Sequence, residues 1–180
     1  IDDSIYHTDY TIAKWPDPKA QMAWLNNTLG QVQQLNEKVI LIFHHPSYDL
    51  NYEVSKDYIN LITKYSKYII IQLHGHVHMN DFYVIKDSND QPLLPAFIGG
   101  SLTTTGIGGG SNLGCGISGN PGFTLYYYNR SNFEILDLEY WWADLEKTNK
   151  NNKPIWLKRY SAKEIYNLTN FTAESINKAK

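Results

Sequence analysis

Apolar positions in the first eighty residues follow two spacings, one helical and one extended. Apolar residues at intervals of three and four predict helices from about 18 to 34 and over 52–65. Unbroken apolar runs predict buried strands over 39–43 and 68–73. A strand, a helix and a second strand in this order imply a right-handed crossover between parallel strands. The first half of the chain therefore predicts an α/β core.

After residue 78 the pattern changes to short apolar segments separated by turn residues. Polar residues at 129–132 favour a hairpin between two of these segments. A further short strand is expected at 1–6. The other predicted elements are strands at 82–85, 96–98, 123–128, 133–138 and 155–161, and helices at 162–167 and 172–178. The second half therefore predicts an antiparallel sheet followed by short helices.

Five of the six histidines cluster at the ends of the first two predicted strands. They are His44, His45, His74, His76 and His78. Neutral imidazole is the commonest metal ligand, and Gly75 allows a sharp turn before His76 and His78. In an extended or turning segment these two side chains can face one crevice, one for each ion of a two-metal site. Alternatively, they flank a turn and face solvent. His45 and His74 are either packing residues or supports for the ligands.

These histidine segments resemble a known family. His44-His45-Pro46 and Gly75-His76-Val77-His78 resemble the last two motif blocks of the calcineurin-like metallophosphoesterases. Other segments narrow the resemblance to the acid sphingomyelinase-like phosphodiesterases, and they occur in that family's order at 21–25, 38–42, 95–101, 120–126 and 156–160. The implied fold is α/β: the carboxyl-terminal half of a metallophosphoesterase αββα sandwich over 1–140, with a short helical C-terminal extension over 141–180.

The resemblance also implies a binuclear metal centre. His44 and His76 match the ligands of one ion, and His78 matches a ligand of the other. The two divalent ions would be zinc, with iron or manganese as alternatives. His45 stands where related enzymes have an apolar residue, so the resemblance gives it no role. Asn120 and Phe123 lie near the segment that walls the substrate pocket in related enzymes, which makes them candidates for substrate contact.

The motif blocks of the family's amino-terminal half are not found in this sequence. Those blocks, Asp-x-His, Gly-Asp and Gly-Asn-His, supply the bridging aspartate, the other ligands and the histidine that protonates the leaving group. His7 precedes Asp9, the reverse of the required order. We therefore expect this chain to carry metal ligands but no catalytic acid, and to need the amino-terminal half of the same enzyme as its partner.

Composition excludes several classes of function. A net charge of −2 leaves no basic surface for nucleic acid. No apolar run approaches the ~20 residues of a transmembrane helix, so no membrane span is expected. Cys115 is the single cysteine and is either free or bridged to another chain. Glycosylation sequons begin at Asn26, Asn129, Asn167 and Asn170. Together with the resemblance, they favour a secreted, lysosomal or vacuolar glycoprotein.

The predicted function is metal-dependent hydrolysis of phosphodiester or phosphoanhydride bonds. The resemblance admits nucleotides, choline phosphodiesters and sphingomyelin-type lipids as substrates. The isolated chain is expected to be inactive. Two alternatives remain open at the level of sequence. One is a non-catalytic half-domain or degenerate interaction module. The other is an unrelated metal hydrolase with a similar His-x-His segment.

Overall fold

Four strands form the first sheet, which has helices on one face. The computed structural model describes residues 18–50, 52–104 and 120–179. The strands are β1 (Val39–Ile42), β2 (Ile69–His74), β3 (Asp81–Lys86) and β4 (Pro92–Ile98). Their spatial order is β1-β2-β4-β3. Strands β1, β2 and β4 run parallel and β3 is antiparallel to β4. This confirms the predicted α/β class.

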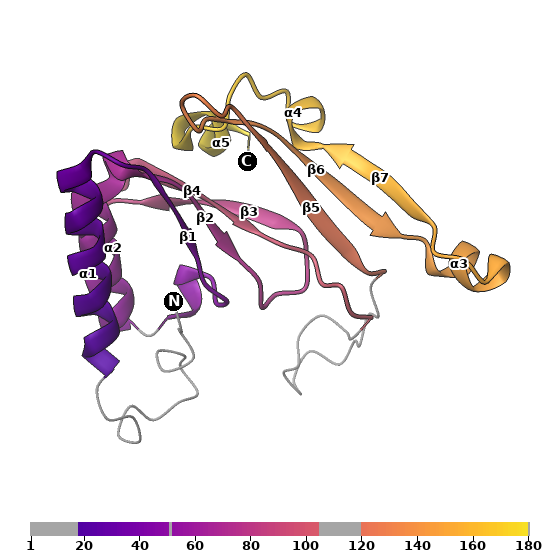
Figure 1. Ribbon diagram of the computed structural model, residues 1–180, viewed down its shortest axis with the longest axis horizontal. Coiled ribbons are helices and arrows are strands. Elements are labelled where there is room, and N and C mark those ends of the chain that lie inside the picture. The colour runs from indigo at the N-terminus through magenta and orange to yellow at the C-terminus, as the bar shows by residue number, and fades with distance from the viewer. Residues whose placement is uncertain (1–17, 51, 105–119, 180) are drawn as a thin grey trace.

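Two helices cover the outer face of this sheet (Figure 1). They are α1 (Pro18–Leu35) and α2 (Tyr52–Tyr65), which follow the helical apolar spacing closely. Leu29 of α1 and Ile62 of α2 are almost wholly buried in the same core as Leu41 of β1. Two short 3-10 turns, Ser47–Asp49 and Ser66–Tyr68, join the helices to the strands.

A second, antiparallel sheet packs toward the inner face of the first (Figure 1). It contains β5 (Gly122–Tyr128), β6 (Ile135–Ala143) and β7 (Trp156–Ser161) in that order. The predicted hairpin joins β5 to β6, and the Asn129 N–H donates to the Glu134 carbonyl across it at 2.8 Å. Helices α3 (Leu145–Asn151), α4 (Ala162–Ile165) and α5 (Ala173–Lys178) complete the chain.

Apolar residues from both sheets and the last helix form the inner core. Ile71 of β2 and Phe97 of β4 lie in one buried cluster with Leu138 of β6. Phe171 and Ile176 close the same cluster from the end of the chain. The 141–180 segment, expected to be a helical extension, also contributes β7, which pairs with β6. Its side chains thus form part of the packing between the layers.

Several sequence expectations differ from the structure. The strands at 82–85 and 96–98, expected in the antiparallel sheet, are instead β3 and β4 of the first sheet, where β4 pairs parallel with β2. Strand β6 begins at Ile135 because residues 129–133 are used in the turn, where Phe133 has a φ of 62°. Helix α3 was not predicted. The strand expected at 1–6 and Cys115 lie outside the described residues. No described helix has the length and apolar character needed to cross a membrane.

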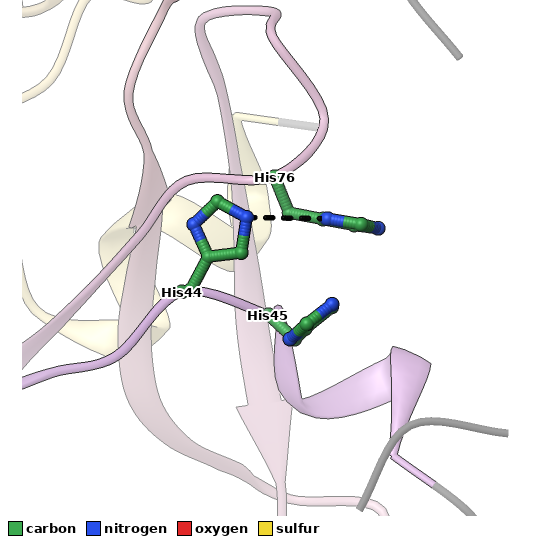
Figure 2. A group of neighbouring side chains, drawn as sticks. All are labelled: His44, His45 and His76. Atoms are coloured by element: carbon green, nitrogen blue, oxygen red, sulfur yellow. Dashed lines mark hydrogen bonds between the residues drawn. The ribbon is translucent and has the colours of Figure 1, made fainter. Parts of the chain in front are cut away.

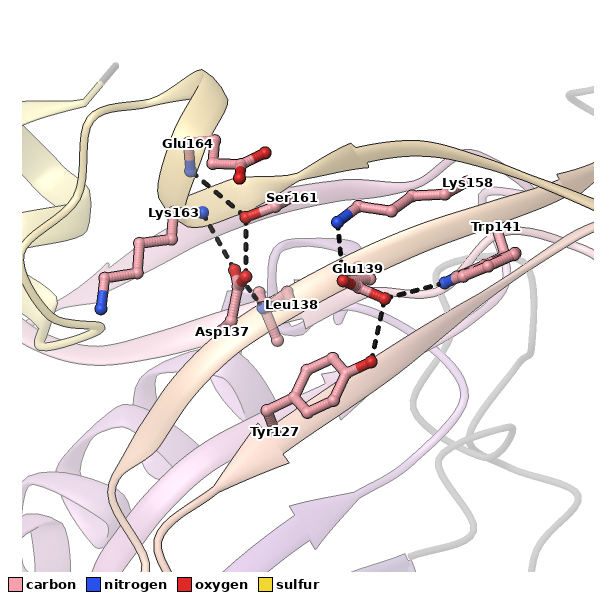
Figure 3. Close-up of polar contacts among 9 residues, drawn as sticks. All are labelled: Tyr127, Asp137, Leu138, Glu139, Trp141, Lys158, Ser161, Lys163 and Glu164. Carbon is pink, nitrogen blue, oxygen red and sulfur yellow. Dashed lines mark hydrogen bonds and ion pairs between the residues drawn. The ribbon is translucent and has the colours of Figure 1, made fainter.

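Glu139 of β6 holds the second sheet together through three polar contacts (Figure 3). Its carboxylate pairs with Lys158 Nζ at 2.7 Å and accepts hydrogen bonds from Trp141 Nε1 at 3.1 Å and the Tyr127 hydroxyl at 2.9 Å. The hydrogen bonds from Lys158, Trp141 and Tyr127 together lower the pKa of Glu139 below its ordinary value.

The lowered pKa predicts an acid-sensitive contribution to stability. It is present above the unfolded-state pKa and lost as the pH falls through the folded-state value, because the protonated acid no longer pairs with Lys158. We expect Glu139→Gln to flatten the dependence of the free energy of unfolding on pH in the acidic range, measured by denaturant titration. The exposed Glu134→Gln is the matched control and should follow the unaltered chain. Identical acid profiles for all three proteins would contradict this role.

Candidate metal centre

Two loops at one edge of the first sheet carry the histidines. Because β1 and β2 are parallel neighbours, their carboxyl ends meet at the same edge. His44 lies just beyond β1, and His76 lies just beyond β2. The Gly75 N–H donates to the His44 carbonyl at 2.9 Å, so backbone hydrogen bonding continues between the two loops. The strands therefore fix the separation of the two histidines before any ligand is present.

Three imidazoles from these loops form one compact group (Figure 2). One ring nitrogen each of His44, His45 and His76 lies within 4.8 Å of those of the other two. His76 Nδ1 and His44 Nε2 are 3.3 Å apart. The His45 and His76 ring centroids are 4.1 Å apart. His44 and His76 are exposed, and His45 is buried beneath them.

The loop after β2 is bent sharply at His76. The Val77 N–H donates to the Gly75 carbonyl at 2.8 Å, which makes a three-residue turn centred on His76. His76 has a φ of 67°, in the left-handed region that costs energy for residues other than glycine. A Cβ on Gly75 would lie 3.2 Å from His44 Nδ1, so a larger residue at this position would displace the His44 ring slightly. The strained turn aims the His76 ring at His44.

The expected ligand set is thus only partly reproduced in this group. His44 and His76 are brought together as expected. His78 is half-buried further along the same loop, with a φ of 61°, and lies outside the group of three. His45, which the resemblance left without a role, takes the third place in the group. The signal in the sequence was the unbroken His44-His45 pair itself.

A carboxylate lies on the far side of the His76 ring from His44. Asp49 Oδ2 is 3.9 Å from His76 Nε2, while His76 Nδ1 faces His44. Metal-bound histidines commonly present their second ring nitrogen to a carboxylate, which orients the ring. Asp49 follows the first histidine loop in a short 3-10 turn, and no motif in the sequence marked it.

Tyr83 of β3 ties the two histidine loops together from below. Its hydroxyl accepts a hydrogen bond from the Ser47 N–H at 3.0 Å and lies 3.1 Å from both Ser47 Oγ and His74 Nε2. Burial raises the pKa of Tyr83 to about 12, so the hydroxyl keeps its proton at neutral pH. The His74 ring also packs edge-on against the Phe43 ring, with the two ring centroids 4.3 Å apart. His74 is thus a packed, hydrogen-bonded residue that anchors the start of the second loop.

Tyr83→Phe should loosen this anchor. Removing the hydroxyl deprives the Ser47 N–H and His74 Nε2 of this partner. The loss should lower the free energy of unfolding by about 1–3 kcal/mol. We expect affinity for zinc to fall by about 10-fold or more, as for other residues that support metal ligands. Denaturant unfolding and zinc titration measure the two effects. Tyr48→Phe is the control, because the Tyr48 ring packs 5.2 Å from Tyr83 but is exposed. Equal free energies of unfolding and equal zinc affinities for Tyr83→Phe and Tyr48→Phe would contradict the anchoring role of Tyr83.

Of the two candidates for substrate contact, Phe123 lies on β5 of the second sheet and Asn120 just before that strand. Asn120 Oδ1 accepts a hydrogen bond from the Leu145 N–H at 3.2 Å, at the start of α3. The Phe123 ring packs against Trp156 of β7 at 5.1 Å. Asn120 thus contacts the start of α3 and Phe123 contacts β7, and neither residue belongs to the histidine group.

The four sequons differ in their surroundings. Asn26 is half-buried on α1, and its Oδ1 accepts a hydrogen bond from the Tyr65 hydroxyl at 3.1 Å. Asn129 begins the β5–β6 turn, where its Oδ1 accepts from the Ser131 N–H at 2.9 Å. Asn167 and Asn170 are exposed between α4 and α5. The last two are therefore the most accessible of the four asparagines.

Comparison with known proteins identifies relatives along most of the chain. It is 28% identical to human cyclic GMP-AMP phosphodiesterase SMPDL3A, over 89% of this chain and 36% of the relative. It is 29% identical to sphingomyelinase phosphodiesterase C of Dictyostelium discoideum, over 91% of this chain and 39% of the relative. Mouse acid sphingomyelinase-like phosphodiesterase 3b is 25% identical, over 97% of this chain and 40% of the relative. This chain is homologous to the acid sphingomyelinase-like phosphodiesterases.

These relatives are named as phosphodiesterases, and this chain resembles them over most of its own length. The chain spans less than half the length of the curated relatives it matches. No family model matches the sequence. The α/β architecture agrees with part of a metallophosphoesterase fold, as the resemblance implied.

The donor set fits a divalent transition-metal ion. Two nitrogens bound to one tetrahedral ion at 2.0–2.1 Å stand about 3.3 Å apart. The separation of His76 Nδ1 and His44 Nε2 has this value, 3.3 Å. Imidazole nitrogens suit zinc, iron and related ions, whereas magnesium and calcium prefer oxygen ligands. The histidine group is therefore a candidate site for a zinc-like ion.

Proposed function

We propose that this chain is the carboxyl-terminal, metal-holding part of a binuclear metal-dependent hydrolase of phosphodiester or phosphoanhydride bonds. The observation that supports it most strongly is the imidazole group at the carboxyl ends of β1 and β2. This group coincides with the two motifs that carry the family resemblance. The chain is homologous over about nine-tenths of its length to proteins named as phosphodiesterases. The geometry and the motif resemblance therefore point to the same residues.

Each histidine has a distinct role in this proposal. His44 and His76 hold one divalent ion through His44 Nε2 and His76 Nδ1, which face each other. His78 supplies a ligand to the second ion, as the resemblance implies. Bound zinc, iron or manganese would polarise the phosphoryl oxygens and activate a water for attack. Asp49 lies on the far side of the His76 ring, with Oδ2 3.9 Å from Nε2, and Tyr83 keeps the two loops at a fixed separation.

The remaining ligands and the acid for the leaving group belong, in this proposal, to an amino-terminal half that packs on the uncovered side of β1. Strand β1 is at the edge of its sheet and, within the described residues, pairs only with β2. Ile40 and Ile42 on its inner face are 45% and 64% exposed. A groove of about 450 Å³ runs from Ile40 and Leu73 to Phe133 on the hairpin. An open strand edge beside an apolar groove favours further β-structure as the partner.

The substrate class in this proposal covers nucleotides, choline phosphodiesters and sphingomyelin-type lipids. Two relatives are named for cyclic GMP-AMP and for sphingomyelin, which share the phosphodiester group. We further propose a secreted, lysosomal or vacuolar glycoprotein. The exposed sequons at Asn167 and Asn170 support this placement best.

Hydrolysis of a chromogenic phosphodiester tests the proposed function. The 180-residue chain alone should show little turnover. The longer protein that contains both halves should turn over the substrate in the presence of zinc, manganese or iron. A longer protein that binds metal but hydrolyses neither phosphodiesters nor phosphoanhydrides would overturn the proposal.

A further inference from the structure

We propose that His45 is a third protein ligand of the ion held by His44 and His76, so that this chain alone carries a three-imidazole site. The inference rests on the proposed function only in using the same ion. It departs from the resemblance, which places an apolar residue at this position and gives it no role. The occupant is a borderline divalent ion such as zinc or cobalt, which accepts neutral nitrogen donors.

The first support is the position of the His45 ring. Its centroid lies 4.1 Å from that of His76 and 5.0 Å from that of His44. A ring nitrogen of His45 lies within 4.8 Å of the nitrogens that the other two present. Ligands of one ion at 2.0–2.1 Å are never more than about 4.2 Å apart, so small rotations about the side-chain bonds bring all three into range. Figure 2 shows the three rings gathered between the two loops.

The second support is the contrast with His74, the other buried histidine near the site. His74 packs against Phe43 and is within hydrogen-bond distance of the Tyr83 hydroxyl, which explains its burial by packing and hydrogen bonding. His45 instead lies with its ring beside two further imidazoles. His45 is the buried member of this group, and an ion shared with the two exposed rings would offset the cost of burying its polar ring. His45 therefore has the surroundings of a ligand and His74 those of a packing residue.

The third support is the chemistry of the complete set. Three imidazoles hold a zinc ion in catalytic sites and leave the fourth position open for water or substrate. The burial of His45 beneath the exposed His44 and His76 places the two accessible rings at the surface. A phosphoryl group in solution could reach an ion held there from the side of the exposed His44 and His76 rings.

Zinc affinity and the visible spectrum of bound cobalt test the inference on the 180-residue chain. The variants are His45→Leu, His44→Ala, His76→Ala and His74→Phe, with folding checked by circular dichroism. Leucine fills the buried position with an apolar side chain. If the His45→Leu protein does not fold, His45→Gln takes its place. Zinc affinity is measured by competition with a chromophoric chelator. Cobalt absorption reports the number of nitrogen ligands.

We expect His45→Leu to weaken zinc binding by about 100-fold or more and to change the cobalt bands, because a ligand is lost rather than a support. His74→Phe should weaken binding by about 10-fold and leave the bands unchanged. Unchanged cobalt bands and affinity in His45→Leu, with zinc lost in His44→Ala and His76→Ala, would overturn this inference but not the proposed function. Absence of zinc binding by the unaltered chain would overturn the inference, whereas the proposed function is judged on hydrolysis by the longer protein.

Discussion

If the proposed function is right, replacing His76 with alanine should reduce phosphodiester hydrolysis by the proposed longer protein about 1,000-fold or more. His76 Nδ1 lies 3.3 Å from His44 Nε2, so its loss opens the coordination shell of the ion that both hold. An ion contributes several kcal/mol of transition-state charge stabilisation, and each 1.36 kcal/mol corresponds to a factor of about ten in rate. The measurement is the turnover rate at saturating zinc, together with metal content by elemental analysis.

Met79→Ala is the matched control for this variant. Met79 lies in the same loop and its side chain is exposed, so its removal should change neither rate nor metal content. A His76→Ala protein that keeps its metal and its rate would remove the main support for the site. Loss of rate with full metal content would instead assign His76 a role in substrate binding.

Ile42→Lys should reduce both self-association of the isolated chain and its binding to the proposed amino-terminal half. Ile42 is 64% exposed on the uncovered face of the edge strand β1. In the isolated chain a charged residue at this edge should reduce self-association. Burying an isoleucine contributes about 1.5–3 kcal/mol, so its loss should weaken binding of the other half at least 10-fold. Analytical ultracentrifugation measures both effects.

Leu35→Lys is the control, because Leu35 is similarly exposed but is the last residue of α1, a helix on the opposite face of the sheet from the apolar groove. It should leave both self-association and binding of the amino-terminal half unchanged. Similar effects of the two substitutions would show that surface apolarity in general, and not the β1 edge, drives association.

The elements with strong apolar periodicity could be predicted from sequence, and those defined by polar contacts could not. The helix expected at 52–65 has these same bounds in the structure, because its apolar stripe faces the sheet. Helix α3 has a single apolar residue, Leu145, and forms where the Asp144 side chain accepts a hydrogen bond from the Lys147 N–H. Periodicity carries no signal for such a helix, although a capping aspartate does.

The site was predictable as far as the strands determine it. Parallel strands bring His44 and His76 to one edge of the sheet, which the pattern of apolar runs implied. The places of His45, Asp49 and Tyr83 depend on turn geometry and on contacts between distant segments. A φ of 67° at His76 rotates its ring toward His44, and no sequence rule specifies that turn. His78 remains a predicted ligand of the second ion.

Hydrolysis of a chromogenic phosphodiester by the longer protein, before and after metal removal, tests the central claim most directly. The account predicts that a chelator abolishes turnover, that zinc, manganese or iron restores it, and that His44→Ala and His76→Ala proteins regain little of it. Turnover that persists in the metal-free protein, or that returns fully in both histidine variants, would contradict the claim that these imidazoles hold a catalytic ion.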